Sequence, residues 1–142
     1  MKNVNSQFIE SKLEHIIEYV KRLDIVLGYS DEEIRSDFFK LHTLERLIQL
    51  IVDEMVDINM HFIRYSDVKT PDDFQSTFRI LAEMDILPFD FAERIAPTVG
   101  LRNRLVHRYE EIKSELLIGA AKKEKDDFRE YLKYIREAYI RA

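Results

Sequence analysis

The sequence predicts an all-α fold, an antiparallel bundle of four to five helices. The 142 residues include only three glycines and three prolines, so few positions interrupt a helix. Apolar residues recur at spacings of three and four along most of the chain, which is the period of one face of an α-helix. No segment shows the alternation of a half-buried strand. The length suits one domain, residues 1–142, with its own core.

Two long helices are predicted in the first half of the chain, over residues 6–27 and 37–65. Gly28 ends the first helix as a C′ residue, and Ser30 caps a short helical turn over residues 31–33. The apolar stripe of the first helix is Ile9, Leu13, Ile16, Val20, Leu23 and Leu27, and that of the second is Leu41, Leu44, Ile48, Ile51, Met55, Ile58 and Phe62.

A third helix is predicted to begin at residues 70–73, Thr-Pro-Asp-Asp, and to stop near Asp85. This segment offers a capping hydroxyl, a proline at the first helical position and acids in the first turn. Pro88 begins a fourth helix that reaches His107 and is kinked by Pro97, which removes a backbone donor. The apolar residues of the third helix are Phe74, Phe78 and Leu81.

A fifth helical region begins near Ser114, and Gly119 is a point where it can bend. Its amphipathic end carries Phe128, Leu132, Ile135 and Tyr139. The other aromatic residues are expected in the core or at an interface; they include Phe38, Phe39, Tyr131 and Tyr134.

Composition narrows the functional classes. The net charge of −5 argues against broad, non-specific binding to nucleic acid or to an anionic membrane. The absence of cysteine excludes disulfides, a thiol nucleophile and zinc–thiolate sites. No apolar run approaches the roughly 20 residues of a membrane span, and the N-terminus lacks the apolar core of a signal peptide. A cytoplasmic protein without membrane association is therefore expected.

The most informative segment is residues 100–109, Gly-Leu-Arg-Asn-Arg-Leu-Val-His-Arg-Tyr. Arg102 falls where the helical pattern requires an apolar residue, because the inward stripe of this helix reads Ala92, Ile95, Val99, Arg102, Val106. An unpaired guanidinium at such a position would be costly to desolvate. A functional site is a natural explanation for its presence.

The same segment is locally basic. Residues 94–108 contain four arginines and His107 but no carboxylate. Contact with phosphate is therefore expected to be local, with Arg104 and Arg108 as RNA-binding residues, and a second copy of the segment would strengthen it.

The residue types suit cleavage of a phosphodiester that carries its own nucleophile, the ribose 2′-hydroxyl. A histidine can take or give a proton near neutral pH, so His107 would handle the proton. Arg102 would stabilise the charge that gathers on the phosphate oxygens, and Asn103 could orient either partner. At roughly 100° per residue, Arg102 and His107 lie about 140° apart on a regular helix. Either the helix unwinds near His107, or two subunits form a composite site in a symmetric dimer.

Each residue also has a purely structural interpretation. Arg102 could pair with a carboxylate of a neighbouring helix, for example Glu45, and a histidine near a helix C-terminus is a favourable dipole partner. A tyrosine such as Tyr109 commonly buries its ring at a rim. The other histidines lack metal-ligand spacing, so neither a metal nor another cofactor is expected; these residues are His15, His42 and His61.

Residues 102–109, Arg-Asn-Arg-Leu-Val-His-Arg-Tyr, resemble the signature of the HEPN superfamily, and more closely the R-x4-H-x-Y form of HepT-like toxins. The helical pattern, the length and the place of the motif late in the fourth helix agree. The resemblance implies a metal-independent ribonuclease that acts as a homodimer with both motifs in one cleft. It implies that Arg102 and His107 are the catalytic pair and that Asn103 orients them.

The resemblance also implies regulation by a partner. Tyr109 matches the tyrosine to which an MNT-type nucleotidyltransferase antitoxin transfers AMP. A nucleotide attached beside His107 would occupy and repel the place where RNA lies. The sequence thus predicts the toxin of a HEPN–MNT toxin–antitoxin pair, an endo- or exoribonuclease silenced at Tyr109. The alternatives are a non-catalytic nucleotide- or substrate-binding adaptor of a nucleotidyltransferase, and a structural helical dimer in which Arg102 forms an interface ion pair.

Overall fold

The computed structural model describes residues 4–107 and 112–141. Within these ranges the chain forms helices and no strand, which confirms the all-α prediction. The elements are α1 (Ser6–Leu27), α2 (Asp31–Ser36), α3 (Phe38–Arg64), α4 (Ser76–Glu83), α5 (Phe89–Ile95), α6 (Thr98–His107) and α7 (Ser114–Arg141). The additional elements, relative to the expected four to five, are the short helix α2 and the division of the expected fourth helix into α5 and α6.

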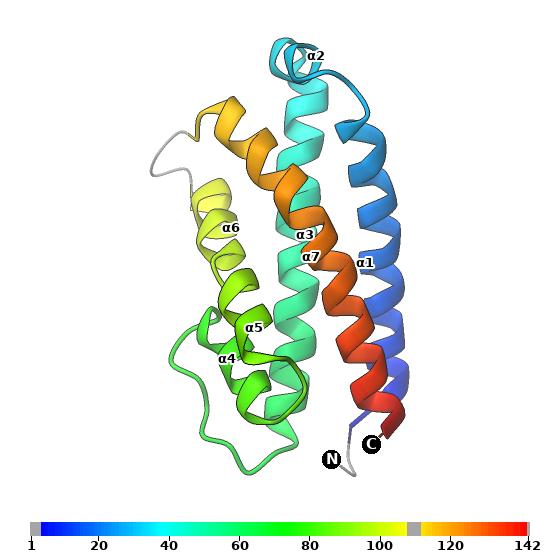
Figure 1. Ribbon diagram of the computed structural model, residues 1–142, viewed down its shortest axis with the longest axis vertical. Helices are drawn as coiled ribbons and strands as arrows, with labels where there is room; N and C mark the ends of the chain where they lie inside the picture. The colour runs from blue at the N-terminus through cyan, green and yellow to red at the C-terminus, as the bar shows by residue number, and fades with distance from the viewer. Residues whose placement is uncertain (1–3, 108–111, 142) are drawn as a thin grey trace.

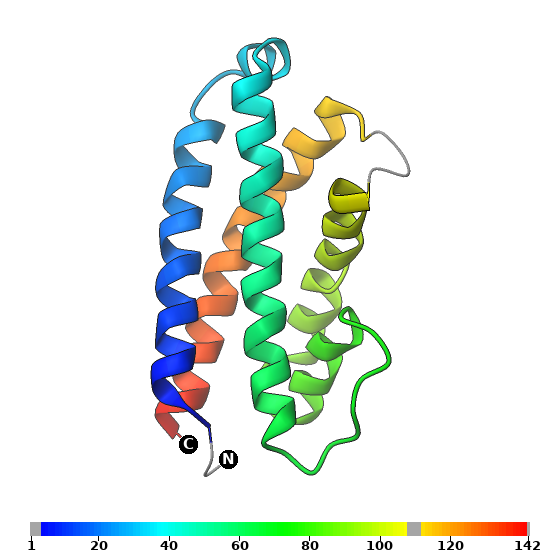
Figure 2. The same ribbon diagram turned by 180° about the vertical axis from the view of Figure 1, so that it is seen from behind.

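The bundle is built around α3. The long helices α1, α3 and α7 run along the longest axis of the molecule, and the short helices α4, α5 and α6 follow one another on one side (Figure 1). α3 contacts α1, α2, α4, α6 and α7. Seen from behind, α3 lies between α1 and the α4–α6 side, and the start of α1 and the end of α7 lie at the same end of the bundle (Figure 2).

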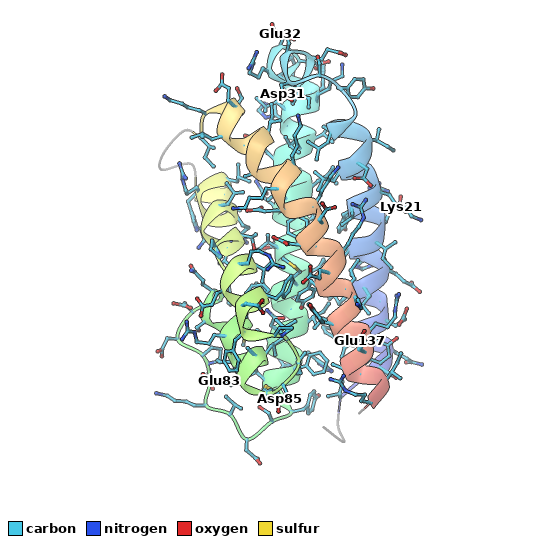
Figure 3. All side chains as sticks on the ribbon, viewed as in Figure 1. Lys21, Asp31, Glu32, Glu83, Asp85 and Glu137 are labelled. Carbon is cyan, nitrogen blue, oxygen red and sulfur yellow. The ribbon has the colours of Figure 1, made fainter. Side chains whose placement is uncertain are left out.

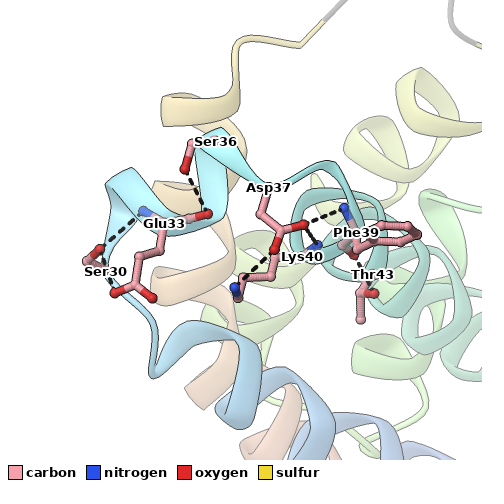
Figure 4. Close-up of polar contacts among 7 residues, drawn as sticks. All are labelled: Ser30, Glu33, Ser36, Asp37, Phe39, Lys40 and Thr43. Atoms are coloured by element: carbon pink, nitrogen blue, oxygen red, sulfur yellow. Dashed lines mark hydrogen bonds and ion pairs between the residues drawn. The ribbon is translucent and has the colours of Figure 1, made fainter.

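Short polar caps define the junction between α2 and α3. The Ser30 hydroxyl accepts a hydrogen bond from the Glu33 backbone N–H at 3.1 Å, and the Asp37 carboxylate accepts from the Phe39 N–H at 2.9 Å. The Asp37 carboxylate also binds the Lys40 ammonium at 3.0 Å (Figure 4). These contacts satisfy donors that a helix leaves unpaired at its first turn. The predicted cap at Ser30 is therefore confirmed.

The apolar stripes predicted for the two long N-terminal helices form the core. All of their members are buried except Leu27 and Leu41, which are partly exposed. From the C-terminal helix, Phe128, Leu132 and Ile135 are also buried, whereas charged side chains such as Lys21, Glu32 and Asp85 lie at the periphery (Figure 3). Phe38 and Phe39 are not core residues, because they are 61% and 71% exposed and stack on one another with ring centres 4.3 Å apart.

The predicted start of the third helix at residues 70–73 was wrong. The helix begins at Ser76, and its N-cap residue, Gln75, makes no side-chain capping bond. The Asp73 carboxylate, and not the Thr70 hydroxyl, accepts a hydrogen bond from the first helical N–H, that of Ser76, at 2.7 Å. Phe74 consequently lies in the preceding loop and is 52% exposed. Phe78 and Leu81 are buried as expected.

Pro97 has a stronger effect than the predicted kink. Because a proline lacks the backbone donor that an interior helical position needs, α5 ends at Ile95 and α6 begins at Thr98. Gly119, by contrast, does not interrupt α7. Among the described residues, no helix combines the length and the apolar character needed to cross a membrane.

A chain of buried hydrogen bonds connects the C-terminal helix to the loop before α4. The Tyr131 hydroxyl lies 3.0 Å from the Met55 carbonyl and 2.6 Å from the Asn59 side-chain oxygen. The Asn59 amide donates to the Thr77 hydroxyl at 3.0 Å, and that hydroxyl donates to the Phe74 carbonyl at 2.6 Å. The side chains of Tyr131, Asn59 and Thr77 belong to fully buried residues. Buried polar groups are costly unless paired, so this series of hydrogen bonds fixes α3, α4, α7 and the loop before α4 relative to one another.

Glu124, in the middle of α7, differs from these residues in the pairing of its buried polar atoms. Its Oε2 atom is buried and has no hydrogen-bond partner among the described residues. Burial, with a smaller contribution from the nearby Asp127 carboxylate, raises the pKa of Glu124 to about 7. Burial penalises the charged form of a carboxyl group, so Glu124 keeps its proton to a higher pH than an exposed glutamate does.

We expect Tyr131→Phe to lower the free energy of unfolding by about 1–3 kcal/mol, because it leaves buried acceptors without their donor. Urea denaturation measures the change. Tyr134→Phe is the matched control: its hydroxyl bonds to the Glu130 carboxylate at a partly exposed position, and its loss should cost less than about 1 kcal/mol. An equal decrease in the free energy of unfolding for the two variants would contradict the stabilising role given to the buried hydrogen bonds of Tyr131.

Candidate functional site

The site is carried by α6, a helix of ten residues that packs against α3. Its buried residues are Thr98, Val99 and Leu105. Val106, predicted on the inward stripe, is instead 40% exposed, so that prediction was wrong. Leu105 takes the inward position because α6 is a separate helix after Pro97 and packs on α3 through the adjacent face. Arg102 therefore lies at the border of the buried face, not in its centre.

Arg102 is held by a carboxylate from α3. Its Nε atom donates to Asp53 Oδ1 at 2.7 Å, and its Nη1 atom donates to Asn103 Oδ1 at 3.2 Å. The Arg102 side chain is 23% exposed and the Asp53 side chain 42%. This ion pair explains how a guanidinium is tolerated next to the core. Glu45, the partner suggested from the sequence, bonds to His42 instead, at 2.6 Å.

Arg102, Asn103 and His107 border one hollow of about 470 Å³. Its other side is formed by residues 72–75 of the loop before α4, and Val99 contributes to the lining. α6 is assigned as an α-helix through His107, so the helix does not unwind to bring these side chains together. They border the same space because the hollow extends around the outer surface of α6.

Arg94 and Arg104, the other arginines of residues 94–108 that the structure describes, are not among the residues that line the hollow. Arg94 lies on α5 and pairs with Asp127 at 3.0 Å and Glu130 at 3.1 Å, so carboxylates of α7 engage it. Arg104 is exposed on α6 and does not line the hollow. Arg108 and Tyr109, predicted to bind RNA and to be modified, lie outside the described residues.

Residues 94–108 contain no carboxylate, but carboxylates from other segments of the chain lie next to this segment in the fold. Asp53 pairs with Arg102, and Asp72 and Asp73 border the hollow from the opposite side. Basic charge is concentrated on α6 and acidic charge on the loop that faces it. A phosphate group would be attracted to the α6 side and repelled from the loop side.

The other histidines are structural or surface residues, as expected. His15 contacts Glu54 and His42 contacts Glu45, whereas His61 accepts a hydrogen bond from the Asn5 N–H at 3.0 Å. Burial, with a smaller effect of Arg64, lowers the pKa of His61. In residues 4–107 and 112–141, no group of three or more His, Asp or Glu side chains could hold a metal ion.

Sequence reasoning missed Asp53 and the loop residues that face α6. Asp53 is 49 positions from Arg102, and no local pattern connects the two. Asp53 also falls among the polar residues of α3, with Gln49 and Asp57 four positions away on either side, so it resembles an ordinary surface residue of an amphipathic helix. The loop residues were missed because residues 70–73 were assigned to the first turn of a helix.

The fold is that of HEPN toxins. The tri-AMPylated HEPN toxin of Shewanella oneidensis, solved in complex with an MNT antitoxin, superposes with a TM-score of 0.86 at 23% identity, covering 94% of this chain and 98% of that one. A cytosolic protein of unknown function from Bacillus subtilis, YutE, gives a TM-score of 0.72 at 17% identity, covering 91% of this chain and 89% of that one.

Sequence comparison defines the family. The model of the family described as Ribonuclease HepT-like matches residues 16–135. The tRNA nuclease HepT of Aphanizomenon flos-aquae is 37% identical over 113 residues, 79% of this chain and 76% of that protein. The mRNA nuclease HepT of Shewanella oneidensis is 23% identical over 131 residues, 92% of this chain and 98% of that protein. The chain therefore belongs to the HepT-like ribonuclease family.

We expect Arg102→Gln to change the free energy of unfolding by less than about 1 kcal/mol, because its partner Asp53 is exposed enough to be hydrated when the guanidinium is removed. Arg94→Gln is the matched comparison. It leaves Asp127, whose side chain is only 12% exposed, without its partner, and should cost about 1–3 kcal/mol. Thermal or urea unfolding measures both. A larger loss for Arg102→Gln would favour a structural role for Arg102.

Proposed function

We propose that this protein is the toxin of a toxin–antitoxin pair and cleaves RNA in the cytoplasm without a metal ion. The family membership supports ribonuclease chemistry. The observation that carries the assignment of residues is the hollow bordered by Arg102, Asn103 and His107. A guanidinium, an amide and an imidazole around one accessible space are the groups that a metal-free phosphodiester cleavage needs.

In the proposed reaction the ribose 2′-hydroxyl loses its proton and attacks the phosphorus. The bond between phosphorus and the 2′-oxygen forms, the bond to the 5′-oxygen breaks, and a proton is returned to that leaving oxygen. His107 transfers the proton. Arg102 stabilises the negative charge on the non-bridging oxygens, and Asn103, already hydrogen-bonded to Arg102, orients the guanidinium. Arg104 and Arg108 contact flanking phosphates.

The proposed active unit is a homodimer with both motifs in one cleft. Arg102 and His107 lie about 140° apart around a regular helix, so one copy of α6 does not direct both groups at a single phosphorus atom. A two-fold axis beside α6 would bring the His107 of one subunit towards the Arg102 of its partner.

We expect the purified protein to cleave single-stranded RNA in excess EDTA, and His107→Ala to reduce the rate by about 10²- to 10⁴-fold, the usual effect of losing an acid–base group. Gel-resolved time courses measure the rate. His42→Ala is the matched control, since His42 is a surface histidine that pairs with Glu45 away from the hollow. Undiminished cleavage by His107→Ala would remove the proton-transfer role, and tight nucleotide binding without cleavage by the wild type would favour the adaptor alternative.

We further propose that an MNT-type nucleotidyltransferase partner silences the toxin by transferring AMP to Tyr109. Support comes from the family motif and from the AMPylated Shewanella toxin solved with its MNT antitoxin. Tyr109 follows His107 by two residues, so a nucleotide on its ring would place negative charge next to the reacting phosphate.

Incubation with the partner enzyme and ATP should add one or more AMP masses to the wild-type protein and abolish RNA cleavage. Tyr109→Phe should remain unmodified and active, because it lacks the acceptor hydroxyl. Intact-mass and peptide mass spectrometry measure the modification, with Tyr65→Phe as the control for an exposed tyrosine elsewhere. AMP addition to Tyr109→Phe at the wild-type level would contradict the assignment.

A further inference from the structure

Phe74 is an exposed aromatic ring on the wall of the proposed active hollow. It lies in the loop before α4, is 52% exposed, and borders the same space as Arg102 and His107. The exposure of this large apolar side chain is not explained by the core, because Phe74 is not a member of the core cluster. Its role has to be found in what enters the hollow.

The position of Phe74 is fixed from inside the protein. Its carbonyl accepts hydrogen bonds from the Thr77 hydroxyl at 2.6 Å and from the Thr77 N–H at 3.2 Å. Thr77 is bound by Asn59, and Asn59 by Tyr131, all fully buried. The backbone at Phe74 is therefore tied to buried side chains of α3 and α7, although the ring itself is exposed. Such support from packed helices preorganises a binding surface.

Charge around the ring determines which part of a nucleotide can lie there. Asp72 and Asp73 adjoin Phe74 on the loop, and both border the hollow. These carboxylates repel a phosphate, whereas Arg102 on the opposite side attracts one. A neutral nucleobase has no such conflict and can stack on the aromatic face. With the phosphate at α6, the base of an adjoining nucleotide reaches the loop.

We propose that Phe74 is the stacking platform for an unpaired nucleobase next to the scissile phosphate, with Gln75 beside it as a hydrogen-bonding group for the base edge. The inference rests on the proposed ribonuclease function and adds a substrate class to it. A base that stacks on a protein ring must have left its helical stack, so the preferred substrate is single-stranded RNA or a loop, not duplex RNA. Phe74 acts here as a positioning residue, and the chemistry stays with Arg102 and His107.

The test compares Phe74→Ala, Phe74→Trp and Phe89→Ala with the wild type. Phe89 is a matched control because it is 56% exposed and lies away from this hollow. Binding is measured by fluorescence anisotropy with a single-stranded oligonucleotide carrying 2′-O-methyl groups, which block the attacking oxygen and prevent cleavage. Stacking is measured by the quenching of 2-aminopurine placed within the same oligonucleotide. Steady-state cleavage of an unmodified single-stranded RNA gives kcat and KM separately.

Phe74→Ala should weaken binding and raise KM by about 5- to 100-fold, the range expected for the loss of one base–aromatic stack, with a smaller effect on kcat. It should also reduce the 2-aminopurine quenching. Phe74→Trp keeps an aromatic ring, so its RNA binding, its KM and its 2-aminopurine quenching should stay close to those of the wild type. Phe89→Ala should match the wild type in the same measurements. Wild-type protein should cleave a hairpin in its loop faster than in its stem.

Three results would overturn the proposal: Phe74→Ala binding within twofold of the wild type, an equal loss in Phe89→Ala, or a changed sedimentation coefficient for Phe74→Ala, which would assign the ring to the subunit interface. The outcome is separable from that for the proposed function. Wild-type cleavage with normal Phe74→Ala kinetics rejects the platform alone. Binding that depends on Phe74 without any cleavage rejects the ribonuclease assignment and leaves the base-binding site standing.

Discussion

The arrangement of the molecule depends on the burial of α3. This helix is covered by α1 and α7 and also by α4 and α6, so a polar side chain on its buried face needs a partner within the protein. Two polar side chains of α3, one buried and one at the edge of the buried face, affect the hollow. Asn59 joins Tyr131 to Thr77, and Asp53 pairs with Arg102 at the border of the core. The same helix thus positions the loop on one side of the hollow and the arginine on the other.

Charge in the hollow is balanced more closely than the basic motif suggests. The guanidinium of Arg102 is paired with Asp53 through its Nε atom, and Asp72 and Asp73 border the same hollow. A surface of this kind attracts a polyanion only along the α6 side. The overall net charge of −5 gives no long-range attraction for RNA. Binding therefore depends on how well an RNA segment fits the contacts within the hollow.

The sequence predicted those parts of the fold that depend on local interactions. The bounds of α1 agree with residues 6–27, because the apolar stripe ends there, and Ser30 caps α2 through a bond to a residue three positions away. The role predicted for Gly28 was wrong: it is the C-cap residue, with φ of −73°, and not a left-handed C′ residue. The start of α4 was missed because Thr70 and Asp73 are both good caps, and only the packing of Thr77 and Phe78 decides between them. Val106 was predicted to face inwards, but Leu105 does so instead. Which of the two is buried depends on the orientation of α6 after Pro97, which the sequence pattern does not give.

The site was predictable in its residue types but not in its surroundings. The grouping of Arg102, Asn103 and His107 is a property of one helix and can be seen in the sequence. Asp53 and the loop at Phe74 reach the hollow only through tertiary packing, over separations that no helical period spans. Asp53 lies among other polar residues of α3, such as Gln49, Glu54 and Asp57, so nothing in the sequence distinguished it.

Glu124 gives the protein a proton whose occupancy varies around neutral pH, since its pKa is raised to about 7. Between a pH of about 4.5, where an exposed glutamate releases its proton, and about 7, the folded chain carries a proton that the unfolded chain has already released, so the free energy of unfolding falls as the pH rises through this range and is constant above it with respect to this group. The same physical rule would apply to association: a partner that changed the burial of this carboxyl would change its pKa, and binding would then take up or release protons.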